Sequence, residues 1–271
     1  MPTYETFTVE LTDHIATVRF NRPEKANSIN ETGWTEMQHI FETLDAEPDC
    51  RVIILTGTGK HFSSGIDLTL LMDLQKFNQI DCEGRKREAL RAFIFKLQRS
   101  ITAIERCRKP VLAAVHGACL GGGFDIAAAC DLRYAAANAK FAVKEIDLGF
   151  VADIGILQRL PKIISPAMAA ELAYTGRTVS GAEAERMQLV NRCYETPETL
   201  HAGVRDLARQ IAAKSPLAIR GTKENLLYAR DHTVDDALNY MVAWNASMLL
   251  SNDTLEAFQA SVLKRVPKFA N

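Results

Sequence analysis

The sequence predicts an α/β fold, and two apolar runs joined by a helical segment carry that prediction. Residues 52–56 and 111–115 are continuous apolar runs with the length of strands that are buried on both faces. Between them, apolar residues from Leu90 to Ile104 recur at helical spacing. Because a helix intervenes, we expect the two strands to be parallel neighbours in one sheet.

The other elements follow from the same periodicities. Residues 6–10 and 15–20 alternate apolar and polar side chains around a polar turn, which is typical of a β-hairpin. A helix is predicted after the next loop, because apolar residues recur there at helical spacing: Trp34, Met37, Ile40, Phe41 and Leu44. Helix-start patterns at residues 180–183 and 233–236 indicate that the last third is helical.

Composition excludes several classes of protein. The 32 basic and 33 acidic residues leave a net charge of -1, so no overall field attracts nucleic acid or anionic lipid. The longest apolar stretch, residues 111–124, is too short and too rich in glycine to span a bilayer. The six cysteines lack the spacing of a zinc or redox motif, so no metal is expected. Neither end resembles a targeting signal, which favours a cytoplasmic protein.

Two small-residue turns are candidates for binding an anion. Gly121–Gly123 separate a buried strand from a good helix former, and a turn of this kind presents unpaired amides at the positive end of a helix. Ser64 lies in a second such turn, after the preceding strand. Amides from the two turns can converge on one carbonyl oxygen as an oxyanion hole. The alternatives are an ordinary tight turn and a serine nucleophile, but no nucleophile-elbow motif surrounds Ser64.

The stretch 141–155 alternates acidic and apolar residues. A carboxylate in such a setting either faces solvent or lies in an apolar pocket, where burial raises its pKa toward the range of general acid–base catalysis. For each acid taken singly, the solvent-facing position is favoured. His116 is interpreted as a hydrogen-bonded core residue.

Four segments together resemble the crotonase family, also called the enoyl-CoA hydratase/isomerase family: residues 21–30, 62–68, 109–123 and 129–133. The resemblance covers nearly the whole chain. It implies a spiral of strand-strand-helix units with a helical C-terminal region, assembled as a homotrimer or a dimer of trimers. It places the core and the acyl-CoA site in residues 1–200. Residues 201–271 would then mediate assembly and cover the pocket.

The resemblance also assigns binding residues. The backbone amides of Ser64 and Gly122 would hold the thioester oxygen of an acyl-CoA. No separate cofactor is expected, because coenzyme A is part of the substrate. The residues that would contact coenzyme A are Lys25, Ala26, Ser64, Ile66, Asp67 and Leu68.

Three acids distinguish this chain within the family. Hydratases carry a glutamate at the positions of Asp125 and Glu145, whereas this chain has aspartate at the first and a third acid, Asp153. The triplet resembles the family's isomerases that convert 3,5-dienoyl-CoA to 2,4-dienoyl-CoA in the β-oxidation of unsaturated fatty acids. Asp147, between the last two acids, is expected to face outward or to serve the structure.

Moving two double bonds removes a proton from C2 and returns one at C6, and a base and a separate acid serve such distant carbons most simply. Glu145 is expected near C2 and Asp153 near C6, although the order could be reversed. Asp125 would adjust the protonation of the other two. The alternatives are a hydratase that uses Asp125 and Glu145, and a non-catalytic member that binds RNA through the basic residues 85–108.

Overall fold

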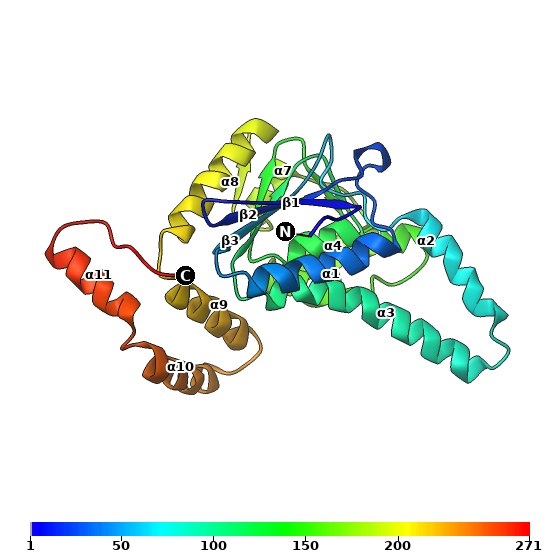
Figure 1. Ribbon diagram of the computed structural model, residues 1–271. Helices are drawn as coiled ribbons and strands as arrows, with labels where there is room; N and C mark the ends of the chain where they lie inside the picture. The colour runs from blue at the N-terminus through cyan, green and yellow to red at the C-terminus, as the bar shows by residue number, and fades with distance from the viewer. Residues whose placement is uncertain (1) are drawn as a thin grey trace.

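The computed structural model describes residues 2–271. Six strands form the main sheet in the order β1-β2-β3-β4-β6-β9, and three short strands form a second sheet in the order β5-β7-β8 (Figure 1). The strands are β1 Phe7–Thr12, β2 Ile15–Phe20, β3 Val52–Gly57, β4 Val111–Val115, β5 Ala118–Leu120, β6 Leu132–Ala136, β7 Lys140–Ala142, β8 Val179–Ser180 and β9 Arg192–Tyr194.

The helices connect and cover these strands. The α-helices are α1 Glu31–Ala46, α2 Leu68–Asp73, α3 Glu83–Arg106, α4 Gly122–Ala129, α5 Ile156–Arg159, α6 Pro166–Thr175, α7 Gly181–Arg186, α8 Pro197–Ala212, α9 Pro216–Arg230, α10 Val234–Met248 and α11 Asn252–Val262. The short 3-10 helices are η1 Pro23–Lys25, η2 Leu74–Gln79, η3 Glu145–Leu148 and η4 Leu160–Lys162.

The main sheet confirms the predicted strand pairings. β1 and β2 form an antiparallel hairpin, and β2, β3, β4, β6 and β9 then pair in parallel. The predicted parallel pair, β3 and β4, lies at the centre of the sheet with Ile53 opposite Val111. Every residue of both strands is buried, because helices cover the two faces of the sheet.

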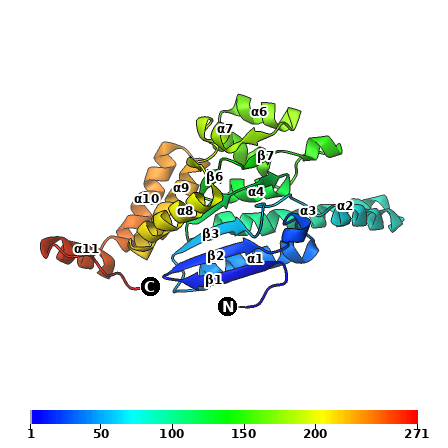
Figure 2. The same ribbon diagram turned by 90° about the horizontal axis from the view of Figure 1, so that it is seen from above.

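Alternate residues of the central strands face different helices. Ile53 and Leu55 belong to the core shared with α1, α3 and α4, whereas Val52 and Ile54 pack in a second core with α8. Figure 2 shows α8 on the opposite side of the sheet from α1 and α3. The parallel strands end on one edge, where the turns leading to α2 and α4 lie, and this edge positions the site described below.

The C-terminal helices α9–α11 extend away from the sheet (Figure 1). The buried Lys223 of α9 fastens them to the core, since its Nζ lies 2.6 Å from the Asp131 carboxylate. The expected boundary at residue 200 falls inside α8, and the division into two parts remains a prediction. No helix within residues 2–271 is long and apolar enough to cross a membrane.

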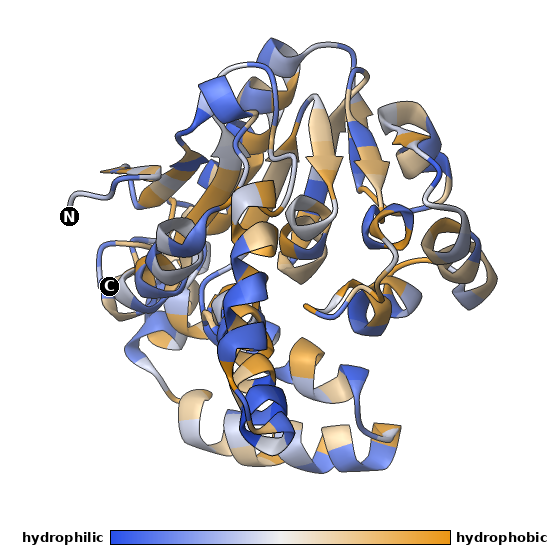
Figure 3. Ribbon diagram, turned by 90° about the vertical axis from the view of Figure 1, so that its right-hand side faces the viewer, coloured by the Kyte–Doolittle hydropathy of each residue, from blue (hydrophilic) through white to orange (hydrophobic). Residues whose placement is uncertain are grey.

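Apolar residues are not confined to the interior, and Figure 3 shows apolar colour on helices at the outside of the molecule. Large apolar side chains are exposed on or beside α9–α11: Leu226, Val234, Leu238, Val242, Leu249, Leu250, Leu255, Phe258, Val262 and Leu263. The single chain therefore leaves a broad apolar face uncovered in its C-terminal region.

Candidate active site

The two predicted turns meet at the start of α4. The segment around Ser63 runs beside β5, with its N–H donating to Ala118 O (2.9 Å) and its carbonyl accepting from Leu120 N (3.1 Å). Gly65 has a φ of +92°, and a Cβ there would lie 2.5 Å from Leu120 O and 3.1 Å from the Gly122 nitrogen. Only glycine fits this close approach, which brings the first turn against the first amide of α4.

The two predicted amides differ in their availability. Gly122 is the first residue of α4, so its N–H has no acceptor within the helix. The Ser64 N–H instead donates to Ala26 O at 3.0 Å. It is therefore already used within the protein, and this corrects the assignment of Ser64 to the oxyanion hole.

Ile66 supplies the amide that Ser64 does not. Ile29 pairs with the neighbours of Ile66, because its N–H donates to Gly65 O (2.8 Å) and its carbonyl accepts from Asp67 N (3.0 Å). Successive N–H groups of an extended segment point in opposite directions. The Ile66 N–H therefore faces away from Ile29, on the side of the segment that borders the Gly122 turn.

A cavity of about 440 Å³ opens at this point. Of the residues expected to contact coenzyme A, Ala26 is the one that does not line it. The lining residues are Lys25, Ser28, Ser64, Ile66, Asp67, Leu68, Leu120, Gly121, Gly122, Lys144, Glu145, Asp147, Leu148 and Phe150. The cavity thus joins the two turns, the start of α2 and η3.

The Asp67 carboxylate serves the structure of this rim. It accepts from Arg22 Nη1 (2.9 Å) and from the Thr69 backbone N–H (3.1 Å), which caps α2. Burial opposes ionisation, but the hydrogen bonds from Thr69 and Arg22 outweigh it and lower the pKa of Asp67 to about 2. The side chain is therefore an anion at neutral pH and is not a proton carrier.

Glu145 lies beside the Gly122 turn. It begins η3 and is buried, and a Cβ added to Gly121 would lie 3.2 Å from its Oε1. Its Oε2 has no hydrogen-bond partner in the part of the chain that is described. Burial raises the pKa of Glu145, and the nearby charge of Asp153 raises it further.

Asp125 lies deeper, in the first turn of α4. The side chain is fully buried, and its Oδ1 accepts from the Ile156 N–H at 2.6 Å. Its Oδ2 is without a hydrogen-bond partner over residues 2–271. Burial raises the pKa of Asp125 well above its usual value, and the charge of Glu145 adds to the effect.

Asp153 is half-buried on the segment between η3 and α5. Its carbonyl accepts from Gln98 Nε2 of α3 (2.6 Å), and burial raises the pKa of its carboxyl. Asp153 is close enough to raise the pKa of both Asp125 and Glu145. We call Asp125, Glu145 and Asp153 the acid cluster. Glu145 alone among them lines the cavity.

Asp147 differs from the acid cluster. Its side chain is half exposed at the rim of the cavity and forms an ion pair with Lys144 at 2.7 Å, as expected of a residue that serves the structure. The acid cluster instead places neighbouring carboxyl groups with raised pKa values beside two free amides. Such a site can polarise a carbonyl oxygen and move protons at carbons near it.

Sequence reasoning missed the use of the Ile66 amide and the position of Trp34. Asp67 caps α2, but this local pattern does not reveal which neighbouring amide is free. The ring of the buried Trp34 would lie 3.2 Å from a Cβ at Gly122, so it packs directly against the first residue of α4. No local pattern distinguishes this tryptophan from an ordinary core residue.

Comparisons with known proteins agree with this geometry. The family model described as enoyl-CoA hydratase/isomerase matches residues 10–271. A peroxisomal Δ3,5-Δ2,4-dienoyl-CoA isomerase of Arabidopsis thaliana is 47% identical over 92% of this chain and 90% of its own length. A mitochondrial isomerase of the same kind from Mus musculus is 42% identical, covering 94% of this chain and 78% of its own.

A solved enoyl-CoA hydratase of Bacillus anthracis superposes with a TM-score of 0.89 and 30% identity, over 98% of this chain and 99% of that one. The predicted family and fold class are thereby confirmed. The isomerase expectation is confirmed too, because the named isomerases are more similar to this chain than the hydratase is.

The expected cytoplasmic location is contradicted by the same relatives, which are named peroxisomal and mitochondrial. It rested on the ends of the sequence, and short targeting signals are addresses that receptors recognise, independent of the fold. The expected substrate class, an acyl-CoA thioester, is that of the relatives. The chain belongs to the enoyl-CoA hydratase/isomerase family.

Proposed function

We propose that this chain converts 3,5-dienoyl-CoA to 2,4-dienoyl-CoA by moving a proton from C2 to C6 through a dienolate. One observation carries the proposal: the buried Glu145 lies beside the Gly121–Gly122 turn, and Asp125 and Asp153 are close enough for their charges to interact with it. The similarity to named dienoyl-CoA isomerases supports the same reaction. Neither a metal nor a separate cofactor has a part in these steps.

The amides of Ile66 and Gly122 hold the thioester oxygen. Removal of the C2 proton places negative charge on this oxygen, and preorganised N–H donors stabilise that charge by about 3 to 4 kcal/mol per donor. The positive end of α4 acts in the same direction. Without this stabilisation the C2–H bond is too weakly acidic for a carboxylate to break.

Glu145 is the base at C2, because it lies next to the turn that holds the thioester oxygen. It must be ionised when the substrate arrives, and its raised pKa makes it a stronger base than an exposed glutamate. Asp153 is the acid at C6, and its raised pKa favours the protonated form that this role requires. The product leaves with the proton positions of the two groups exchanged, and proton transfer between them or with water restores the enzyme.

Asp125 tunes this exchange without contacting the cavity. The negative charges of Asp125, Glu145 and Asp153 repel one another, so ionisation of one group disfavours ionisation of the other two. A shared proton lets one group act as base while another acts as acid.

Assembly as a homotrimer or a dimer of trimers is part of the proposal. The apolar face of α9–α11 would be covered by other copies of the chain. Neither nucleic acid nor membrane is a partner in this proposal, consistent with the net charge of -1.

The direct test supplies a 3,5-dienoyl-CoA and follows the absorbance of the conjugated 2,4-dienoyl thioester. We expect rapid turnover by the natural chain and a loss of about 10²- to 10⁴-fold in kcat for Asp153→Asn, which cannot donate the proton. Asp206→Asn is the matched control, because that exposed carboxylate lies on α8 and does not line the cavity, and it should keep its activity.

The competing hydratase activity is measured with a 2-trans-enoyl-CoA. Efficient hydration without any dienoyl isomerisation would refute the proposal and would favour water activation by Asp125 and Glu145. Full isomerase activity in Asp153→Asn would refute the assigned acid instead.

A further inference from the structure

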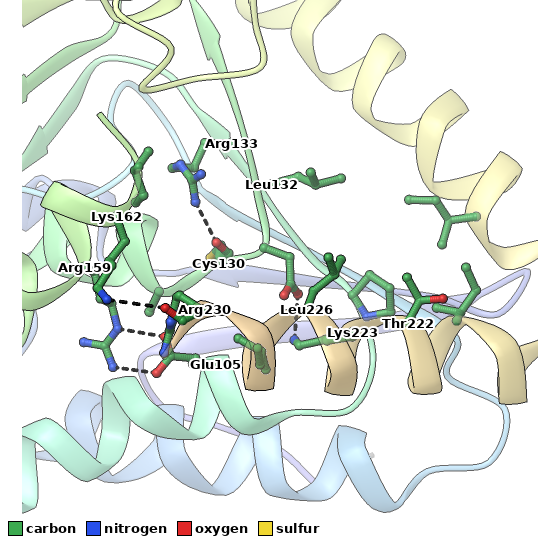
Figure 4. Close-up of a pocket in the computed structure, with 17 residues that line it drawn as sticks. Glu105, Cys130, Leu132, Arg133, Arg159, Lys162, Thr222, Lys223, Leu226 and Arg230 are labelled. Carbon is green, nitrogen blue, oxygen red and sulfur yellow. Dashed lines mark hydrogen bonds and ion pairs between the residues drawn. The ribbon is translucent and has the colours of Figure 1, made fainter. Parts of the chain in front are cut away.

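A largely buried ion-pair cluster joins three helices (Figure 4). One of its members, Arg159, lies close enough to Asp125 of the acid cluster for their charges to interact. Glu105 of α3 accepts from Arg159 of α5 through Nε (3.3 Å) and Nη2 (3.1 Å). Arg230, the last residue of α9, donates to the same carboxylate. The side chains of Arg159 and Glu105 are only 12% and 15% exposed, so water screens this contact little.

The segment that ends at Arg159 contains one member of the acid cluster and a backbone N–H that binds another member. It begins at Asp153, whose carbonyl accepts from Gln98 of α3, and continues to Ile156, whose N–H donates to Asp125. Helix α3 therefore holds this segment at two points, through Gln98 at its start and through Glu105 at its end.

Arg159 also touches the middle of the segment. Gly155 has a φ of +132°, and a Cβ there would lie 1.9 Å from Arg159 Nη1. The guanidinium thus packs directly against the backbone between Asp153 and Ile156. A shift of the guanidinium would move the backbone that orients both carboxyl groups.

We infer that Arg159 is a positioning residue for the isomerisation. Glu105 holds it in place and is itself held by Arg230, so that the helical C-terminal region fixes the geometry of the acid cluster. This inference rests on the proposed function. It gives α9 a role in chemistry that is separate from assembly, because Arg230 reaches Glu105 within one chain.

Electrostatics give Arg159 a signature that a purely structural residue would lack. Burial and the charge of Glu145 raise the pKa of Asp125, and the charge of Asp153 raises it slightly further. The hydrogen bond from the Ile156 N–H and the positive charge of Arg159 lower this pKa. Arg159 is the one cation in this balance. Removing its charge raises the pKa of Asp125. Because the three carboxyl groups titrate as a coupled set, activity should then disappear at a higher pH when the solution is acidified.

The test compares the steady-state kinetics of Arg159→Met, Arg159→Lys, Glu105→Gln and Arg230→Met with the natural chain over a range of pH. For Arg159→Met we expect kcat to fall by about 10- to 100-fold, with little change in KM, because misplacement of catalytic groups by about 1 Å has effects of this size. The acid side of its pH profile should move to higher pH.

Arg159→Lys keeps the positive charge and loses the bidentate contact with Glu105. The acid side of its pH profile, which we call the acid limb, should stay near that of the natural chain, while its kcat should lie between those of Arg159→Met and the natural chain. Glu105→Gln and Arg230→Met should lower kcat by smaller factors. The double variant Glu105→Gln/Arg159→Met should have about the same kcat as Arg159→Met alone, because both changes break the same contact between Glu105 and Arg159. Arg209→Met, which removes an exposed ion pair on α8, is the control.

Natural kcat and an unmoved acid limb in Arg159→Met would overturn the inference, as would a loss of thermal stability and activity with an unmoved acid limb. If Arg159→Met does not fold, unchanged kcat in Glu105→Gln overturns it. Unchanged kcat in Arg230→Met would overturn the role of α9. Absence of isomerisation by the natural chain would instead refute the proposed function.

Discussion

Asp125 and Glu105 are both withdrawn from solvent, yet their surroundings shift their pKa values in opposite directions. Burial and the neighbouring Glu145 raise the pKa of Asp125. Burial also opposes the ionisation of Glu105, but hydrogen bonds from Arg159 and Arg230 outweigh it, and the pKa of Glu105 is lowered. Burial alone therefore does not decide whether a carboxyl group can exchange protons.

The difference lies in the groups that face each carboxylate. In the acid cluster, Asp125 and Glu145 each keep one oxygen without a hydrogen-bond partner in the described part of the chain. In the region that holds α9, Glu105 faces two arginines and Asp131 faces Lys223, although burial still raises the pKa of Asp131. Paired carboxylates stabilise the fold, whereas carboxylates crowded with one another stay available for chemistry.

The largest expected effect separates the roles within the acid cluster. Glu145→Gln should lower kcat by about 10²- to 10⁴-fold, because an amide cannot accept the C2 proton. In D₂O, the natural chain should exchange the C2 hydrogen of bound substrate, and Glu145→Gln should lose this exchange. Mass spectrometry of recovered substrate measures it.

Asp153→Asn should retain the C2 exchange while it loses isomerisation. Exchange that persists in Glu145→Gln and disappears in Asp153→Asn would reverse the assignment of the two groups. The two variants are therefore each other's control.

A smaller effect is expected in the paired region. Lys223 Nζ lies 2.6 Å from Asp131, and the same Asp131 oxygen accepts from the Val111 N–H at 2.7 Å. Lys223→Met leaves a buried carboxylate without its cation, so the free energy of unfolding should fall by about 3 to 5 kcal/mol. Urea denaturation at fixed protein concentration measures the change.

The matched control is Lys96→Met, which removes an exposed ion pair with Glu31 and should cost no more than about 1 kcal/mol. Equal losses in the two variants would mean that burial does not distinguish these ion pairs.

The smallest effect concerns Asp125 and depends on pH. Because the pKa of Asp125 is raised in the folded state, the folded chain holds a proton that the unfolded chain releases above about pH 4. The natural chain therefore loses stability as the pH rises toward the raised pKa. Asp125→Asn lacks this loss and should be more stable at pH 8 by about 1 to 2 kcal/mol.

Well below pH 4 the difference in stability between the two proteins should stay constant, since neither side chain is charged there in the folded or the unfolded state. Thermal or urea unfolding across this pH range measures the trend. A gap that widens toward low pH would contradict the raised pKa of Asp125.

Much of the fold could be predicted from periodicity. The apolar runs at β3 and β4 and the capping residues Ser180 and Thr233 define their elements locally, and the structure confirms them. The candidate acids could be named from the sequence as well. Their grouping could not, because Asp125, Glu145 and Asp153 lie on different elements and only chain packing brings them together.

Hydrogen-bond direction was beyond the sequence for the same reason. Ser64 and Ile66 lie in one short turn, and its pairing with Ala26 and Ile29 engages the first amide and leaves the second available. Pairing between distant segments decides this, since each backbone group bonds whatever the fold places opposite it.

The sequence by itself determined the α/β class, the glycine turn that opens α4 and the identity of the three acids, because these depend on local spacing and residue type. The tertiary structure decided which amides remain free, which carboxylates face cations, and how Arg159 connects α9 to the acid cluster. Hydrogen bonds form only at short distances, and charge interactions weaken as the distance grows. These properties therefore depend on which segments, far apart in the sequence, the fold brings close together in space.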